Sequence, residues 1–116
     1  MIQGLTPMLE TPDLPGTKTF YTEVLGFQVL AEDEGWMSLG RDQAEVMFSL
    51  PNEQRAIAGP ILSGSLYMRT DDADGEWAHL HGRCTVCYPI ATFDYGMREF
   101  GVFDNNGYLL QFGQQL

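Results

Sequence analysis

Apolar positions along this chain recur with two different periods. Residues 4–11, "GLTPMLET", form a short apolar run with β-forming residues, which favours a strand. Between residues 14 and 25 the apolar positions recur at intervals of three and four, as in an amphipathic helix. Asp13 is suited to cap this helix, Pro15 lies in its first turn, and Gly26 follows its last apolar residue. The pattern therefore predicts a strand and then a helix.

The other apolar runs are short and are bounded by turn residues, which predicts strands and loops. A second helix is expected over about residues 73–82, because acidic residues come early in it and Arg83 follows it. A loop at residues 51–62, "PNEQRAIAGPIL", separates the two halves of the chain. Each half thus has the element order β-α-β-β-β. The remaining strands are expected over residues 28–33, 36–41, 44–50, 64–70, 85–92, 98–104 and 108–113.

This repeated order predicts one domain of the α+β class, built from two tandem modules at about residues 4–50 and 64–113. Two such half-sheets placed side by side form a curled mixed sheet around a concave cleft, and ligands commonly bind in clefts of this kind. We therefore expect the cleft, rather than any single motif, to be the functional site.

Composition narrows the possible classes of function. The chain has 116 residues, enough for one compact domain without a disulfide or a structural metal. No apolar run approaches the roughly 18 residues of a membrane-spanning helix, and the N-terminal "MIQGLTPMLE" lacks the features of an export signal. We therefore expect a cytoplasmic protein with no membrane partner. The net charge of −10 would repel nucleic acid and favours a cationic ligand.

Two pairs of residues have the spacing of redox or metal motifs, but their placement favours other roles. Cys84 and Cys87 form a C-x-x-C, yet they run into a predicted strand, where residues three apart point to opposite faces. His79 and His81 are two apart in the predicted second helix and so lie on different faces of it. We interpret the cysteines as structural or incidental and the histidines as solvated helix residues.

Two motifs at opposite ends of the chain point to a family. The helix segment "DLPGTKTFYTEVLGFQV" and the closing hairpin "YGMREFGVFDNNGYLLQF", with the repeated β-α-β-β-β order, resemble the vicinal oxygen chelate superfamily. That group includes glyoxalase I, extradiol dioxygenases, fosfomycin-resistance transferases and bleomycin-resistance proteins. The family's usual "DPDG" turn is replaced here by "DNNG" at residues 104–107, whose residue types still suit a turn. The resemblance covers nearly the whole chain.

Metal-dependent members of this family place ligands on the first strand, on the first strand of the second module and near the end of the last strand. The resemblance puts these positions at about Thr6, Ser65 and Gln111. These side chains supply no imidazole, thiolate or carboxylate for a transition metal, and Glu10 is the one carboxylate nearby, closer to the end of the first strand. We therefore expect no bound metal and no other cofactor.

Alternation along the strands adds Met8, Tyr67 and Arg69 to the face that carries these three positions. Such a mixture of apolar, aromatic and polar groups suits a flat, partly polar organic molecule, although filling the core is an equal alternative for Met8 and Tyr67. No catalytic residue is assigned. The expected ligand-binding residues are Thr6, Met8, Ser65, Tyr67, Arg69 and Gln111.

Two hypotheses of function remain open. The first is a non-enzymatic protein similar to the bleomycin-resistance proteins, binding a planar or cationic compound such as a drug or a metabolite. The missing ligand triad, the negative charge and the aromatic content of 12% support it. The second is an enzyme, a lyase, isomerase or dioxygenase, either metal-free or with a metal site at other residues; the family resemblance supports it. The resemblance also implies a homodimer, because family members of this size commonly pair about a two-fold axis.

Overall fold

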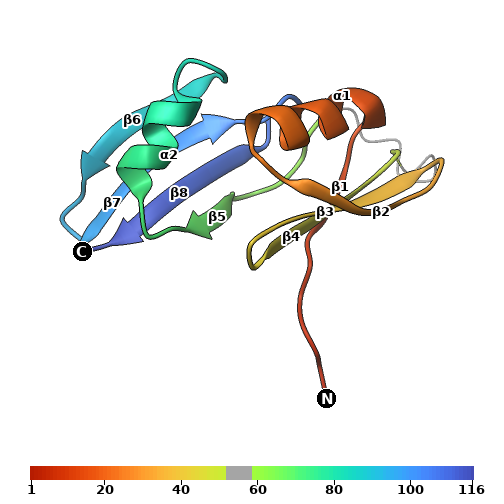
Figure 1. The fold of residues 1–116 in the computed structure, drawn as a ribbon, viewed down its shortest axis with the longest axis horizontal. Coiled ribbons are helices and arrows are strands. Elements are labelled where there is room, and N and C mark those ends of the chain that lie inside the picture. The colour runs from red at the N-terminus through yellow and green to blue at the C-terminus, as the bar shows by residue number, and fades with distance from the viewer. Residues whose placement is uncertain (52–58) are drawn as a thin grey trace. The chain divides into compact units, whose positions relative to one another are not determined.

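The computed structural model describes residues 1–51 and 59–116, which divide into two compact units, Met1–Ile61 and Leu62–Leu116. Each unit holds one helical region and four strands (Figure 1). The first unit comprises β1 Met8–Glu10, α1 Leu14–Thr19, the π-helix η1 Phe20–Val24, β2 Gln28–Glu32, β3 Trp36–Arg41 and β4 Ala44–Ser49. The second comprises β5 Leu66–Arg69, α2 Ala73–Leu80, β6 Val86–Thr92, β7 Met97–Phe103 and β8 Leu109–Gln115.

Both units have the same sheet topology. The strand order is β1-β4-β3-β2 in the first unit and β5-β8-β7-β6 in the second. In each unit the first strand pairs in parallel with the last, and the other pairings are antiparallel. The predicted α+β class with two tandem β-α-β-β-β modules is therefore confirmed, and each module folds as a mixed four-stranded sheet.

The helical region of the first unit begins and ends as predicted. The N–H of Gly16 donates to Asp13 Oδ1 at 3.0 Å, and Pro15 lies in the first turn. Gly26, with a φ of +77°, follows the end of the helix. The structure differs from the prediction in one respect, since Phe20–Val24 is π-helical rather than α-helical.

Tyr21, within this π-helical segment, lies at the centre of the first core. Its side chain is fully buried, and its ring packs edge-to-face against Phe27 and Phe48 at centroid distances of 5.5 and 5.1 Å. Phe48 is on β4 and Phe27 precedes β2. One aromatic residue of the helical region thus contacts both β4 and the residue that leads into β2.

In the second unit, α2 packs against β6, β7 and β8 (Figure 1). Ala73 and Leu80 of the helix are fully buried, and Trp77 meets Phe100 of β7 edge-to-face at 5.3 Å. Burial of such apolar side chains stabilises the unit by roughly 1.5–3 kcal/mol for each large residue. The face of the sheet toward α2 is therefore the core of this unit.

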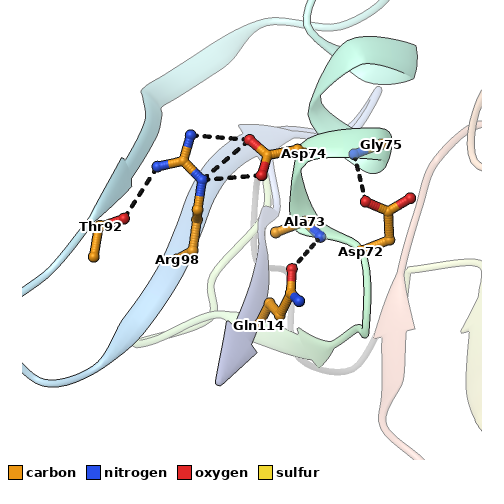
Figure 2. Close-up of polar contacts among 7 residues, drawn as sticks. All are labelled: Asp72, Ala73, Asp74, Gly75, Thr92, Arg98 and Gln114. Atoms are coloured by element: carbon orange, nitrogen blue, oxygen red, sulfur yellow. Dashed lines mark hydrogen bonds and ion pairs between the residues drawn. The ribbon is translucent and has the colours of Figure 1, made fainter. Parts of the chain in front are cut away.

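Polar contacts fix the start of α2 to the sheet, as Figure 2 shows. Arg98 of β7 donates to both carboxylate oxygens of Asp74 at 2.9–3.1 Å, and the N–H of Ala73 donates to Gln114 of β8 at 3.0 Å. The hydrogen bonds from Arg98 lower the pKa of Asp74. Arg98 and Gln114 are register partners, so the even-numbered residues of β7 and β8 face α2. Their odd-numbered neighbours point away from it.

The two units share a local sequence motif that the strand and helix pattern alone did not reveal. "TPDLPG", residues 11–16, and "TDDADG", residues 70–75, both have the form T-x-D-x-x-G. In each, the aspartate N–H donates to the threonine hydroxyl, at 3.2 and 3.1 Å, and the glycine N–H donates to the aspartate carboxylate at 3.0 Å. The repeated cap supports the duplication predicted from the element order.

The predicted hairpin turn at residues 104–107 is also present. Asp104 Oδ1 accepts hydrogen bonds from the N–H groups of Asn106 and Tyr108, both at 2.9 Å. The first strand is shorter than predicted, with only Met8–Glu10 in regular pairing, because Pro7 and Pro12 bracket it and neither has an N–H to donate. Part of the predicted loop at 51–62 lies outside the described residues.

The two cysteines and two histidines all lie in the second unit. Cys84 and Cys87 are free thiols, and burial raises the pKa of Cys84. His79 and His81 are exposed, and His81 stacks on Trp77 at 4.9 Å. No helix within residues 1–51 and 59–116 is long and apolar enough to cross a membrane.

Candidate ligand-binding face

The second sheet has one apolar face and one polar face. The buried residues Phe100, Val102, Leu110 and Phe112 point toward α2. On the opposite side, the register places Tyr67 of β5 beside Gln111 of β8, which lies beside Gly101 of β7. Six residues of this side are here called the tyrosine face. They form two hydrogen-bonded groups: Ser65, Gln111 and Tyr88 in the first, and Tyr67, Glu99 and Tyr95 in the second.

Two side-chain hydrogen bonds of the tyrosine face each pass over a glycine in the strand between their partners. Tyr67 of β5 donates to Glu99 of β7 across Gly113 of β8. A Cβ on Gly113 would lie 1.9 Å from the Tyr67 hydroxyl oxygen, which real structures do not tolerate. Glycine inside a strand commonly marks such a close approach of another group. The hydrogen bond therefore depends on the absence of a side chain at residue 113.

The second hydrogen bond of this kind joins Gln111 and Tyr88. The Gln111 amide of β8 donates to the Tyr88 hydroxyl of β6 at 2.9 Å, across Gly101 of β7. A Cβ on Gly101 would lie 2.5 Å from the Tyr88 ring. The other end of the Gln111 amide accepts a hydrogen bond from Ser65. Both ends of this amide are thus held by the protein, which fixes its orientation.

The group formed by Tyr67, Glu99 and Tyr95 is centred on the carboxylate of Glu99. Tyr67 donates to one carboxylate oxygen and Tyr95 to the other. Glu99 is only 4% exposed, although Tyr67 and Tyr95 are 43% and 62% exposed. Exposed tyrosine rings therefore cover a buried carboxylate.

Aromatic packing extends the tyrosine face beyond β7. Phe93 stacks on Tyr95 with ring centroids 5.4 Å apart and an interplanar angle of 4°. The same Phe93 ring meets Tyr88 edge-to-face at 5.9 Å. Three rings from β6 and the following turn thus stand together beside Glu99.

The surroundings of Tyr67 and Tyr88 raise the pKa of both hydroxyls, so both keep their protons over the neutral range. Burial, followed by the hydrogen bond to Glu99 and its negative charge, raises the pKa of Tyr67 to about 12. Burial also raises the pKa of Tyr88; the hydrogen bond from Gln111 lowers it in part, and Glu99 raises it. A phenol that keeps its proton can donate to a carboxylate or to a ligand.

Four of the six expected ligand-binding residues lie in the second unit. Ser65, Tyr67 and Gln111 belong to the tyrosine face, where Ser65 and Gln111 are hydrogen-bonded to each other. Arg69 is on the same side of the sheet, paired in register with Gly113. Its side chain is exposed and makes no hydrogen bond or ion pair with another described residue, including the neighbouring aspartates 71 and 72.

The other two expected residues lie in the first unit. Thr6 precedes β1 and is half-buried, and Met8 begins β1 with 53% of its surface exposed. Met8 pairs in register with Met47 on β4, next to Ser38 on β3, so it faces away from the first core. On this side of the first sheet Ser38 donates to Glu45 at 2.7 Å.

Sequence reasoning did not select three members of the tyrosine face, namely Tyr88, Tyr95 and Glu99. A signal for Tyr88 was present, because Gly101 lies inside a strand and so predicts that a side chain passes over it; Gly113 gives the same signal for Tyr67, which was selected. Which side chains do so depends on the strand order, which brings β5 beside β8 and β8 beside β7. Sequence patterns alone do not specify that order.

The residues of the tyrosine face do not fit a transition-metal site. Such metals prefer imidazole, thiolate or several carboxylates, whereas this face offers one carboxylate, one amide and several hydroxyls. Glu99 is thus the only anionic donor of this face, and both ends of the Gln111 amide are engaged in hydrogen bonds with Ser65 and Tyr88. In the described part of the chain no group of three or more His, Cys, Asp or Glu residues could hold a metal ion.

Comparison with known proteins gives a family match and several structural matches. The model of the Glyoxalase/Bleomycin resistance protein/Dioxygenase superfamily matches residues 6–112. Comparison with curated proteins gave no match to this chain.

Among solved structures, a bleomycin-binding protein complexed with bleomycin is 23% identical, with a TM-score of 0.75 and coverage of 99% of this chain and 100% of that one. A bleomycin-binding protein from Streptomyces verticillus, complexed with copper(II)-bleomycin, is 21% identical, with a TM-score of 0.73 and coverage of 97% and 95%. A lactoylglutathione lyase from Agrobacterium tumefaciens is 14% identical, with a TM-score of 0.74 and coverage of 97% and 94%. At these identities the matches establish the fold.

Proposed function

The chain belongs to the Glyoxalase/Bleomycin resistance protein/Dioxygenase superfamily, and within it we propose that this protein binds a small organic molecule without a catalytic metal. The ligand is a planar or cationic compound such as a drug or a metabolite. The observation that carries this proposal is the tyrosine face, where exposed aromatic rings surround fixed polar groups. Binding sites for small organic ligands typically combine apolar area with a few well-placed polar groups.

The choice of binding over catalysis rests on the chemistry of this face. A metal-dependent reaction needs ligands that Ser65 and Gln111 do not supply. Covalent catalysis by Ser65 would need a base beside its hydroxyl, but this hydroxyl donates to the Gln111 amide, which is not a base. The solved bleomycin-binding proteins of the same fold support binding as the function.

The ligand contacts proposed here are those of the expected site. Tyr67 is proposed to pack its ring against the ligand, and Gln111 and Ser65 to offer polar contacts. Arg69 lies on the same side of the sheet, on the edge strand β5. Thr6 and Met8 are proposed as contacts from the first unit. A ligand with an aromatic part gains area from the rings and orientation from the polar groups.

We also propose that the protein is a homodimer. Several large apolar residues of the first unit are exposed, among them Met8 at 53%, Leu30 at 57% and Leu50 at 45%. Met8 and Leu30 lie on β1 and β2, the two edge strands of their sheet. Exposed edge strands with apolar side chains favour pairing with another chain.

Most large apolar and aromatic residues are accommodated within the cores of the two units. Met37, Phe48 and Phe112 are at most 2% exposed, and Trp36 and Phe93 are half-buried. The argument for a dimer therefore rests on the exposed aliphatic residues of the first unit and on the family resemblance.

A ligand screen with a matched variant tests the proposed function. Thermal unfolding is followed with planar aromatic compounds, some neutral and some cationic, for the wild-type protein and for Tyr67→Ala. We expect a subset of compounds to raise the melting temperature of the wild type, and Tyr67→Ala to weaken their binding by about 1–3 kcal/mol. Tyr67→Phe is the control, because it keeps the ring. Equal affinity for the wild type and a folded Tyr67→Ala would remove Tyr67 from the site.

A further inference from the structure

Glu99 and the aromatic rings around it have the composition of a site for an organic cation. We propose that Glu99, with Tyr67, Tyr88 and Tyr95, binds the positively charged nitrogen of the ligand, in the form of a protonated or quaternary amine. This inference rests on the proposed function and specifies the ligand class of that same face. The argument uses the charge of the carboxylate, the rings that cover it and the room left at its oxygens.

The negative charge of Glu99 has no positive partner in the described part of the chain. Glu99 is 4% exposed, and its hydrogen bonds come from tyrosine hydroxyls. Arg69, on the same side of the sheet, forms no ion pair with it. Arg98 is the neighbour of Glu99 in sequence, but it faces α2 and pairs with Asp74. Buried carboxylates are normally paired with a cation, so this one is suited to accept a cation from outside.

The rings around Glu99 suit the same kind of ligand. A cation within about 6 Å of a tyrosine ring is attracted by the negative face of the ring, and quaternary ammonium ligands are commonly held in this way. Tyr67 comes from β5, Tyr88 from β6 and Tyr95 from the turn before β7, so the rings come from three different segments on the same face of the sheet. Phe93 stacks on Tyr95 and supports its ring.

The carboxylate has room for a ligand donor. A carboxylate offers about four acceptor positions, and Tyr67 and Tyr95 use one on each oxygen. Tyr95 is 62% exposed, so its side chain can rotate away and give its place to an ammonium group without disturbing the core. The net charge of −10 further attracts cations toward the protein.

The alternative is that the cluster only stabilises the sheet. In that case Glu99 serves as an acceptor for tyrosine hydroxyls, and the charge of a ligand makes no difference to its binding. A pair of small ligands that share a shape but differ in charge separates these two cases. Benzylamine, which is protonated at neutral pH, and benzyl alcohol, which is neutral, form such a pair.

Both compounds are titrated into the isotope-labelled protein at neutral pH and low salt, and binding is followed by NMR at the resonances of residues 67, 88, 95 and 99. We expect benzylamine to bind at least about fivefold more tightly than benzyl alcohol. We expect Glu99→Gln, which keeps the size of the side chain, to abolish that preference. Glu34→Gln, at an exposed turn residue, is the control with the same change of net charge and is expected to keep the preference.

Equal binding of the two compounds by the wild type, or an unchanged preference in Glu99→Gln, would overturn the cation site. If Glu99→Gln fails to fold, Tyr95→Leu removes one exposed ring and is expected to reduce the preference for benzylamine by at least about threefold; an unchanged preference would again overturn the site. Binding of both compounds at this face without a preference leaves the proposed function standing. If neither compound shifts these resonances, the cation site is wrong, and the proposed function is judged by the Tyr67→Ala screen.

Discussion

The side-chain amide of Gln111 donates to the Tyr88 hydroxyl at 2.9 Å, passing over Gly101 in the strand between them. Gln111 occupies the position where the family resemblance places a metal-binding carboxylate in metal-dependent members. Its carbonyl end accepts from Ser65, so both ends of the amide serve the protein itself. Gln111 of the last strand therefore holds Ser65 and Tyr88 in place on the tyrosine face.

Gly113→Ala is expected to break the contact between Tyr67 and Glu99. The new Cβ would lie 1.9 Å from the Tyr67 hydroxyl oxygen, and the exposed ring would move aside. We expect a loss of about 1–2 kcal/mol in the free energy of unfolding, as for one hydrogen bond, and weaker binding of aromatic ligands. Gly82→Ala is the control, since nothing lies within 4 Å of its Cβ. Chemical denaturation measures the free energy of unfolding of both variants. Equal effects of the two substitutions would contradict the hydrogen bond from Tyr67 to Glu99 across Gly113.

The titration of Tyr67 gives a test of its contact with Glu99. Its pKa is raised to about 12 in the folded protein, against about 10 in an unfolded chain. The folded state therefore holds the Tyr67 proton more tightly than the unfolded state does. The contribution of Tyr67 to the free energy of unfolding is present below pH about 10 and is lost as the pH rises toward 12. The tyrosinate absorbance of the wild type minus that of Tyr67→Phe should show a group that titrates near pH 12. Burial is the largest cause of this rise, followed by Glu99, so a difference curve centred near pH 10 would show that Tyr67 lacks the surroundings described here.

A single carboxylate at residue 111 is not expected to create a metal site. Gln111→Glu supplies one suitable ligand, whereas transition metals need about four to six donors in all, and the resemblance offers only Thr6 and Ser65 beside it. We expect weak or no binding of nickel and zinc to this variant and to the wild type by isothermal titration calorimetry. Nanomolar affinity in either protein would mean that other residues form a metal site and would favour the enzyme hypothesis.

The proposed dimer makes a prediction about concentration. Sedimentation at micromolar protein should give a species of twice the 13.0 kDa chain mass. Leu30→Lys, on an edge strand, should shift the distribution toward monomer, because it places a charge in the exposed apolar area. If the subunits share their ligand sites, dilution should also weaken ligand binding. A clean monomer at micromolar concentration would end the dimer proposal.

The predicted elements agree with the structure because local rules determine them. The helix over 14–25 was indicated by apolar spacing, by Asp13 at its start and by Gly26 at its end, and all three are present. The strand at 36–41 has the predicted limits. The π-helical geometry of Phe20–Val24 was not predicted, because apolar spacing of three and four does not distinguish a π-helical turn from an α-helical one; Tyr21 of this segment packs against Phe48 on a distant strand. Tertiary packing decides such details.

The tyrosine face was only partly predictable for the same reason. Alternation along β5 and β8 placed Tyr67, Arg69 and Gln111 on one side, and the register agrees with that placement. Glu99 and Tyr88 became neighbours of these residues only through the order β5-β8-β7-β6, which joins strands far apart in sequence. The glycines at 101 and 113 carried a local signal of close approach, but not the identity of the approaching side chain.

The measurement that tests the central claim most directly is a map of backbone amide shifts on ligand binding. A compound that raises the melting temperature is titrated into the labelled protein, and each amide shift is assigned. We expect the largest shifts at Tyr67, Tyr88, Glu99 and Gln111, on the side of the second sheet that faces away from α2. Saturable binding with its largest shifts confined to α2 or to α1, and with these residues unperturbed, would contradict the assignment of the tyrosine face as the ligand site.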